Sequence, residues 1–148
     1  MSISRRCLLA AAAALPFLPL AVAKAAAPSL DFEELYGKVS PLGLSFSDKV
    51  KGLAGQPVAM RGFMAPPLKA VANFFVLTEI PMSICPFCST DSDWPDNIVV
   101  VYLDSAQTFE QANALIDVSG KLEMGSWTDP ETGFVSLLRI TSASFAGV

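Results

Sequence analysis

The sequence predicts an all-β domain that closes into a small barrel with one or two short helices. Apolar and polar residues alternate with a period of two in several short segments, as they do in half-buried strands. Pro66-Pro67, Pro81 and Pro130 interrupt these segments and mark turns. The roughly 120 residues that follow an N-terminal leader suit one domain with its own core.

The first expected elements are short. Leu30–Tyr36 (LDFEELY) has the pattern of an amphipathic turn of helix, and Ser47–Leu53 that of a second short helix or a loop ending at Gly55. Pro57–Met64 (PVAMRGFM) then alternates as a strand does. Within it, Gly62 marks a bulge or a point of close packing.

The later segments carry stronger apolar patterns. Ala72–Glu79 and Asn97–Leu103 are predicted strands, and the second is apolar on both faces and therefore central. Thr108–Leu115 (TFEQANAL) is the best helix candidate. Ile116–Met124 and Phe134–Ala143 form a final strand pair, joined by a T-D-P-E-T-G turn. By strand alternation, the expected core includes Phe63, Phe75, Leu77, Val99, Val101, Leu122 and Leu138.

Five strands with a short helix between the third and the fourth fit a Greek-key barrel of the oligonucleotide/oligosaccharide-binding (OB) type. Four segments carry a further resemblance: Leu53-x-Gly55-x-x-Val58-x-x-x-Gly62-Phe63-Met64-x-Pro66, Phe74–Leu77, Pro95–Val100 and Val118–Glu123. Over Leu44 to Ser144 the chain resembles exported bacterial OB-like barrel proteins of unknown function. The resemblance implies an exported barrel and supplies no activity. The family's cysteine-containing loop commonly carries histidine or adjacent cysteines, and this chain departs from that pattern.

The N-terminus has the three regions of an export signal. Arg5 and Arg6 precede an apolar run, Cys7–Val22, and small residues follow in A-x-A register up to Ala25. The segment around the arginine pair resembles a twin-arginine signal, and an ordinary secretory signal is the alternative. We expect residues 1–25 to be removed, residues 26–43 to form a lead segment and residues 44–148 to form the barrel. The mature protein is expected in the periplasm without a permanent membrane anchor.

The charge balance excludes some partners. The full chain has 10 basic and 14 acidic residues, and removal of Arg5, Arg6 and Lys24 leaves a net charge of −7. An acidic domain lacks the electrostatic footprint of a nucleic-acid-binding protein. The chain contains no histidine, which excludes a Ser-His-Asp or Cys-His catalytic arrangement. We therefore expect no nucleic-acid partner and favour a protein that is not an enzyme.

The candidate site is the motif C-P-F-C, formed by Cys85 and Cys88 with Phe87 between them. Two thiols at this spacing can form a structural disulfide, ligate a soft metal ion, or exchange with a partner's disulfide. A thioredoxin fold requires a helix directly after the motif. Residues 89–96 instead have loop composition, so redox activity here requires another scaffold.

A metal site would draw further ligands from the neighbourhood of the cysteine pair. Met82 precedes Cys85 by three residues, and Asp91 and Asp93 follow the motif. Thiolates and thioethers select Cu(I) or Zn(II), and carboxylate oxygens can complete a zinc tetrahedron. The cofactor expected is Cu or Zn, or none if the pair is structural. Met60 and Met64, by contrast, are expected in the core.

Two aromatic side chains accompany the motif. Phe87 lies within it and Trp94 follows it. These rings suit either of two roles, shielding the thiols or forming a docking surface for a periplasmic protein partner. The sequence leaves metal binding, thiol–disulfide exchange and a structural disulfide open.

Overall fold

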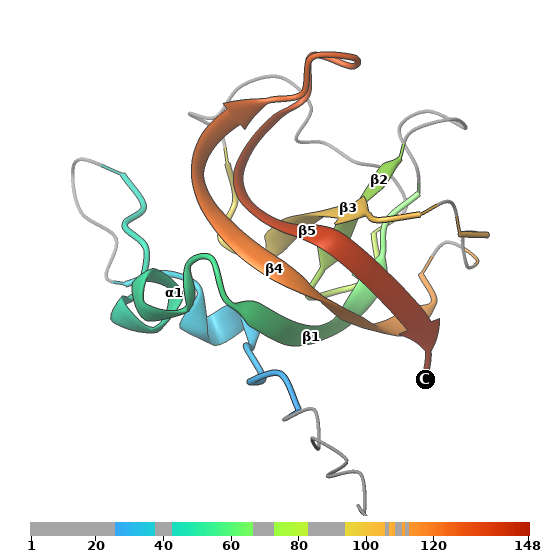
Figure 1. The fold of residues 1–148 in the computed structure, drawn as a ribbon, viewed down its shortest axis with the longest axis horizontal. Helices are drawn as coiled ribbons and strands as arrows, with labels where there is room; N and C mark the ends of the chain where they lie inside the picture. Colours follow the sequence, from blue (N-terminus) through green and yellow to red (C-terminus); the bar gives the residue numbers. More distant parts are fainter. Residues whose placement is uncertain are drawn as a thin grey trace, which may run out of the picture.

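The computed structural model describes residues 26–37, 43–66, 73–82, 94–105, 107–108, 111 and 113–148, and they form a closed five-stranded barrel (Figure 1). Its strands are β1 (Pro57–Met64), β2 (Phe74–Thr78), β3 (Ile98–Leu103), β4 (Leu115–Thr128) and β5 (Val135–Gly147). They follow one another around the barrel in the order β1-β2-β3-β5-β4. The pairs are antiparallel except β3 with β5, which is parallel. The predicted all-β barrel with short helices is confirmed.

The short helices lie before the first strand. A 3₁₀ turn, η1, covers Phe32–Glu34, and helix α1 covers Asp48–Leu53. Ser47 begins α1 because its Oγ accepts a hydrogen bond from the Val50 N–H at 3.1 Å. The same Oγ donates to the Glu34 carbonyl at 2.6 Å, which ties α1 to η1. In the described part of the chain, no helix is long and apolar enough to cross a membrane.

The helix predicted over Thr108–Leu115 is wrong for the described residues of that range. Asn113 adopts a left-handed conformation with φ of 69°, and Leu115 already begins β4. The Asn113 N–H donates to the Met64 carbonyl at 3.0 Å, and the Met64 N–H donates to the Ala114 carbonyl at 3.1 Å. Pairing with the end of β1 therefore outweighs the local helix propensity of this segment.

The inner face of β1 differs from the prediction at one residue. Exposure alternates along the strand so that Val58, Met60, Gly62 and Met64 point inward, and Phe63 is half-buried on the other face. The residue at inward position 62 is a glycine because a Cβ there would lie 2.8 Å from the Thr78 carbonyl oxygen. Phe63 was thus wrongly placed in the core, whereas the predictions for Met60 and Met64 are confirmed at 2% and 1% exposure. The other predicted core residues are buried: Phe75, Leu77, Val99, Val101, Leu122 and Leu138.

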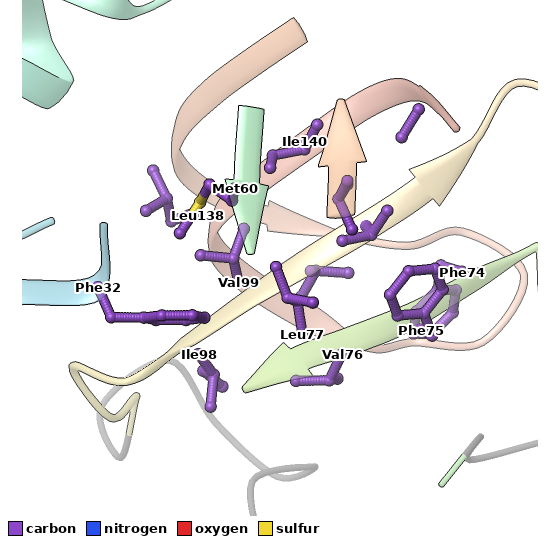
Figure 2. Close-up of a cluster of buried hydrophobic side chains, with 14 of the residues drawn as sticks. Phe32, Met60, Phe74, Phe75, Val76, Leu77, Ile98, Val99, Leu138 and Ile140 are labelled. Carbon is purple, nitrogen blue, oxygen red and sulfur yellow. The ribbon is translucent and has the colours of Figure 1, made fainter. Parts of the chain in front are cut away.

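The lead segment contributes to the barrel core. Leu30 and Leu35 are fully buried, and Phe32 packs into the cluster that contains Met60 and Ile98 (Figure 2). The backbone before Leu30 also pairs in parallel with β1, since the Leu30 N–H donates to the Ala59 carbonyl at 2.9 Å. β2 pairs with β1 only at Phe63 and Met64, so the lead segment covers the edge of β1 that β2 leaves open.

The two longest strands, β4 and β5, curve across the barrel, and their hairpin projects beyond it (Figure 1). Asp129 organises the turn between them. Its Oδ1 accepts hydrogen bonds from Glu131 N at 3.0 Å, Thr132 N at 2.8 Å and Thr132 Oγ1 at 2.9 Å. Burial of Asp129 favours the neutral acid, but the bonds from Thr132 and Glu131 outweigh it and lower the pKa of the carboxyl.

Replacing Asp129 with Ala should lower the free energy of unfolding at pH 7 by about 1–2 kcal/mol, because three donors lose their acceptor. Since the pKa is lower in the folded state, the carboxylate's contribution is present above its ordinary value of 3.8 and is lost as the pH falls through the folded value. The difference between wild type and Asp129→Ala should therefore shrink below about pH 4. Urea unfolding at pH 7 and pH 3 measures it, with Glu131→Gln as the neighbouring charge control. An undiminished difference at pH 3 would contradict this account.

Candidate functional site

The predicted site belongs to the connection between β2 and β3. Of its residues, the structure describes Met82, which is half-buried, and Trp94, which is 5% exposed. The other predicted site residues lie outside the described residues: Cys85, Phe87, Cys88, Asp91 and Asp93. No group of three metal-ligating side chains is found among the residues that are described.

The two ends of this connection are fixed next to each other. Thr78 pairs with Ile98 at the last register position of β2 and β3, and the Glu79 N–H extends the ladder by donating to the Asn97 carbonyl at 3.1 Å. The Thr78 Oγ1 lies 2.7 Å from the Ile80 carbonyl and 3.2 Å from the Phe63 carbonyl. The chain thus leaves β2 and enters β3 at neighbouring positions of the β2–β3 ladder.

Trp94 joins the carboxyl-terminal side of the connection to the lead segment. Its indole Nε1–H donates to the Tyr36 hydroxyl at 2.7 Å. Tyr36 in turn stacks on Phe46 with ring centroids 5.5 Å apart, and the two residues form an isolated antiparallel bridge. The three rings therefore link the carboxyl-terminal end of the β2–β3 connection to residues of the lead segment that are distant in sequence.

The Tyr36 hydroxyl has a raised pKa, which is consistent with a structural role for its contact with Trp94. Burial raises the pKa of Tyr36 to about 12, the hydrogen bond from Trp94 opposes the rise, and the Asp96 carboxylate adds to it. The hydroxyl consequently stays protonated at neutral pH. A small cavity of about 200 Å³ adjoins it, lined by Phe32, Glu33, Tyr36, Gly37, Leu44, Glu79 and Asp96.

Directly before β3, one buried acceptor has no hydrogen-bond partner in the described part of the chain. This acceptor is the Asn97 Oδ1. A buried polar atom without a partner costs about 1–3 kcal/mol, so water or a donor from outside the described residues is expected to meet it. Neither Asn97 nor Tyr36 was found from the sequence. Tyr36 carried no local signal, because its contact with Trp94 joins residues 58 positions apart.

A second polar and aromatic cluster joins Tyr102 on β3 to the hairpin of β4 and β5. Tyr102 meets Trp127 edge to face with centroids 5.2 Å apart, and the Arg139 guanidinium lies 5.3 Å from the Trp127 ring centroid. Arg139 also donates to the Gly125 carbonyl at 2.8 Å. Burial and the Asp129 carboxylate raise the pKa of Tyr102. Arg139 thus joins the two strands of the hairpin, while Trp127 remains 37% exposed.

A shallow hollow of about 600 Å³ lies over the outer face of β1, β4 and β5. Its floor is a row of small side chains in register across neighbouring segments, Ser29, Ala59, Ser119 and Ser144. Beside the row, Arg61 donates from Nε and Nη2 to the Asp117 carboxylate at 2.7 and 2.8 Å. The arginine is thereby neutralised, so the described lining offers no free cation to a phosphate backbone.

These features define a closed five-stranded barrel whose β2–β3 connection carries a C-P-F-C motif. No protein-family model matches the sequence, and a search of curated proteins gives no match. Among solved structures, the chain is similar to a DUF3299 family protein from Pseudomonas aeruginosa, with a TM-score of 0.51 and 12% sequence identity. The match covers 83% of this chain and 97% of that one. At this identity the likeness concerns the fold, and it places the barrel beside a bacterial family whose function is unknown.

Proposed function

We propose that this chain is an exported periplasmic accessory protein whose C-P-F-C motif binds one soft metal ion. In this proposal it is processed near Ala25, belongs with the exported bacterial OB-like barrel proteins, and acts with a periplasmic protein partner in metal delivery. The observation that carries the proposal is the position of the motif. Cys85 and Cys88 are the sole cysteines after the leader, and they lie in the connection whose two ends the barrel fixes side by side.

The chemistry of the surroundings supports a soft cation. Met82 is half-buried three residues before Cys85, and a chain of three residues spans at most about 10 Å. A thioether and two thiolates are ligands that select Cu(I), and thiolates also bind Zn(II). The net charge of −7 expected for the processed chain raises the local concentration of cations around it.

Thiol–disulfide exchange is the second candidate. In that reaction the two thiols become a disulfide while a partner's disulfide accepts two electrons and two protons. We rank this candidate below metal binding. A thioredoxin scaffold places a C-x-x-C thiol at a helix N-terminus, and the described fold is a closed all-β barrel without that scaffold. A structural disulfide is the remaining outcome.

Elemental analysis of the anaerobically purified periplasmic protein, paired with a thiol count, should find one Cu or Zn per chain. The metal should be lost in Cys85→Ser and Cys88→Ser. Met82→Leu should weaken Cu(I) binding at least about tenfold, whereas Met124→Leu, an exposed methionine on β4, should leave it unchanged. The N-terminal residue of the same sample reports the cleavage site, and a retained Arg5-Arg6 pair would refute export by a removable signal.

Two results would contradict metal binding. A metal-free protein with a disulfide potential above about −230 mV would establish exchange, since strained or exposed disulfides are the oxidising ones. A metal-free protein with a potential below about −300 mV would establish a structural disulfide.

A further inference from the structure

We propose that the outer part of the β4–β5 hairpin, residues 125–138, is a strap that closes over an aromatic patch on β2 and β3 and opens by bending at Gly125. The aromatic patch consists of Phe74 on β2 and Tyr102 on β3. The strap thereby determines whether these two rings face water or the protein interior. This conformational device does not depend on the function proposed above.

The aromatic patch lies on the outer face of β2 and β3. Phe74 pairs with Tyr102 across the two strands, and the next pair, Phe75 with Val101, belongs to the barrel core. Because successive side chains of a strand point to opposite faces, Phe74 and Tyr102 point away from that core. Phe74 is nevertheless buried, so another part of the chain covers it.

The strap extends past the ladders that close the barrel. The last registered pair of β1 with β4 is Pro57 with Lys121, and the first of β3 with β5 is Val100 with Arg139. Past these points β4 and β5 continue as a pair with each other (Figure 1). The strap is therefore attached to the barrel by the two strands that lead into it and by side-chain contacts.

Aromatic contacts hold the strap against the patch. Phe134, which is buried, lies with its ring centroid 5.3 Å from that of Phe74. Trp127 meets Tyr102 edge to face at 5.2 Å, and Phe74 and Tyr102 are themselves 5.0 Å apart. Two rings of the strap thus cover two rings of the barrel. Contacts between side chains give way at a lower free energy than a continuous strand ladder does.

The strap has a break in its own ladder at Gly125. The register of β4 with β5 shifts between Met124 and Trp127, and Gly125 has a φ of 108°, a conformation that favours glycine. Arg139 Nη1 donates to the Gly125 carbonyl at 2.8 Å, and its Nε lies 3.4 Å from Glu123 Oε2. A β-bulge bends a ribbon and interrupts its pairing, so a change in the direction of the strap requires the least rearrangement here.

The closed strap also buries a polar atom. Burial and the Asp129 carboxylate raise the pKa of Tyr102, yet its hydroxyl makes no hydrogen bond of normal geometry with a described residue. A buried hydroxyl without a partner is unfavourable, and opening of the strap brings water to it. The closed state is therefore stabilised by the rings and destabilised by the hydroxyl of the same tyrosine.

Hydrogen–deuterium exchange of the purified protein, followed by mass spectrometry, measures the opening. An isolated two-stranded ribbon is marginally stable in water, so the amides of residues 126–137 exchange once the strap leaves the patch. In the wild type they should exchange at least about tenfold faster than those of β1 and β3. Exchange at the same rate in all three segments would overturn the proposal.

Three variants should change this exchange in different directions. Phe134→Ala should accelerate it at least about tenfold, because it removes the ring that covers Phe74. Gly125→Ala should accelerate it about fivefold through the backbone alone, since alanine disfavours a φ of 108° and a Cβ there meets nothing within 4 Å. Tyr102→Phe keeps the ring, removes the unpaired hydroxyl and should slow exchange about fivefold.

The control is Phe46→Ala, which removes an aromatic contact outside the hairpin, with Tyr36. It should leave exchange of the strap within about twofold of the wild type. Circular dichroism confirms that each variant folds, and Gly125→Ala and Tyr102→Phe decide the question even where Phe134→Ala does not fold. An equal rise in β1, β3 and the strap of Gly125→Ala, or faster exchange of the strap in Tyr102→Phe, would contradict the proposal.

A second readout detects the aromatic patch itself. Nile red is a neutral dye whose fluorescence rises in apolar surroundings, and it should bind more strongly to Gly125→Ala than to the wild type. That variant keeps every ring of the strap and the patch, so extra binding reports their separation. Gly52→Ala in α1 should bind the dye as the wild type does. Equal dye binding by Gly125→Ala and the wild type would show that the patch stays covered, and would reject the opening.

Discussion

Replacing Leu30 with Ala should lower the free energy of unfolding by about 2–5 kcal/mol, the cost of emptying a fully buried leucine site. Leu30 has no exposed surface and belongs to the same core cluster as the barrel strands. The backbone cannot follow the shorter side chain inward, because the Leu30 N–H and the Pro28 carbonyl are both hydrogen-bonded to Ala59 on β1. A cavity should therefore remain at this position. Urea unfolding followed by far-ultraviolet circular dichroism measures the change.

Leu115→Ala provides the control for this prediction. Leu115 begins β4 and is 37% exposed, so the same chemical change there should cost less than about 1 kcal/mol. Equal losses for the two variants would mean that the lead segment is not part of the cooperative core. A large loss at Leu30 would instead show that residues before the first strand are required for the stability of the barrel.

Replacing Gly62 with Ala should destabilise the protein by about 1–3 kcal/mol, and replacing it with Val by more. A Cβ at this position would lie 2.8 Å from the Thr78 carbonyl oxygen and 3.0 Å from both Leu77 Cγ and Phe32 Cε2. The nearest atom belongs to the backbone of β2, which β1 and β3 hold on both sides. Relief of the contact therefore requires the strands to separate. Chemical unfolding and the thermal midpoint both report the loss.

Gly52→Ala is the matched control for the close approach at Gly62. Gly52 lies in α1, and a Cβ there meets nothing within 4 Å. Alanine should stabilise this helical position by up to about 1 kcal/mol. A neutral or stabilising effect of Gly62→Ala would show that β1 and β2 can move apart at little cost, and would contradict the packing described for this site.

Strand positions were predictable from the sequence because they depend on local alternation. Pro57–Met64 was predicted with both of its bounds, and the apolar run of β3 was predicted to be central, where it pairs with β2 and β5. The two errors have different causes. Phe63 lies on the face of β1 opposite to Met60, Gly62 and Met64, so strand alternation itself places it outside the core. The segment around Asn113 pairs with β1, which is distant in sequence, instead of forming a helix.

In the candidate site, too, residues with a local sequence pattern were predictable and a residue defined by a distant contact was not. The sequence alone identified the two cysteines, because their spacing is a local pattern, and it named Met82 and Trp94 as neighbours. It did not identify Tyr36, which meets Trp94 only because the lead segment packs against the barrel. A partner 58 residues away leaves no trace in local composition.

The parallel pairing of β3 with β5 has a consequence for the order in which the protein can be made and folded. Val100 pairs with Arg139, and Ile116 at the start of β4 pairs with Gly147 at the end of β5. The ring of strands can therefore close only after β5, the last of the five strands in sequence, has been made. Barrels dominated by such distant pairings fold in about milliseconds to seconds. Until then, the apolar faces of β1, β2 and β3 lack their final partners, and the newly made chain is most exposed to aggregation during that interval.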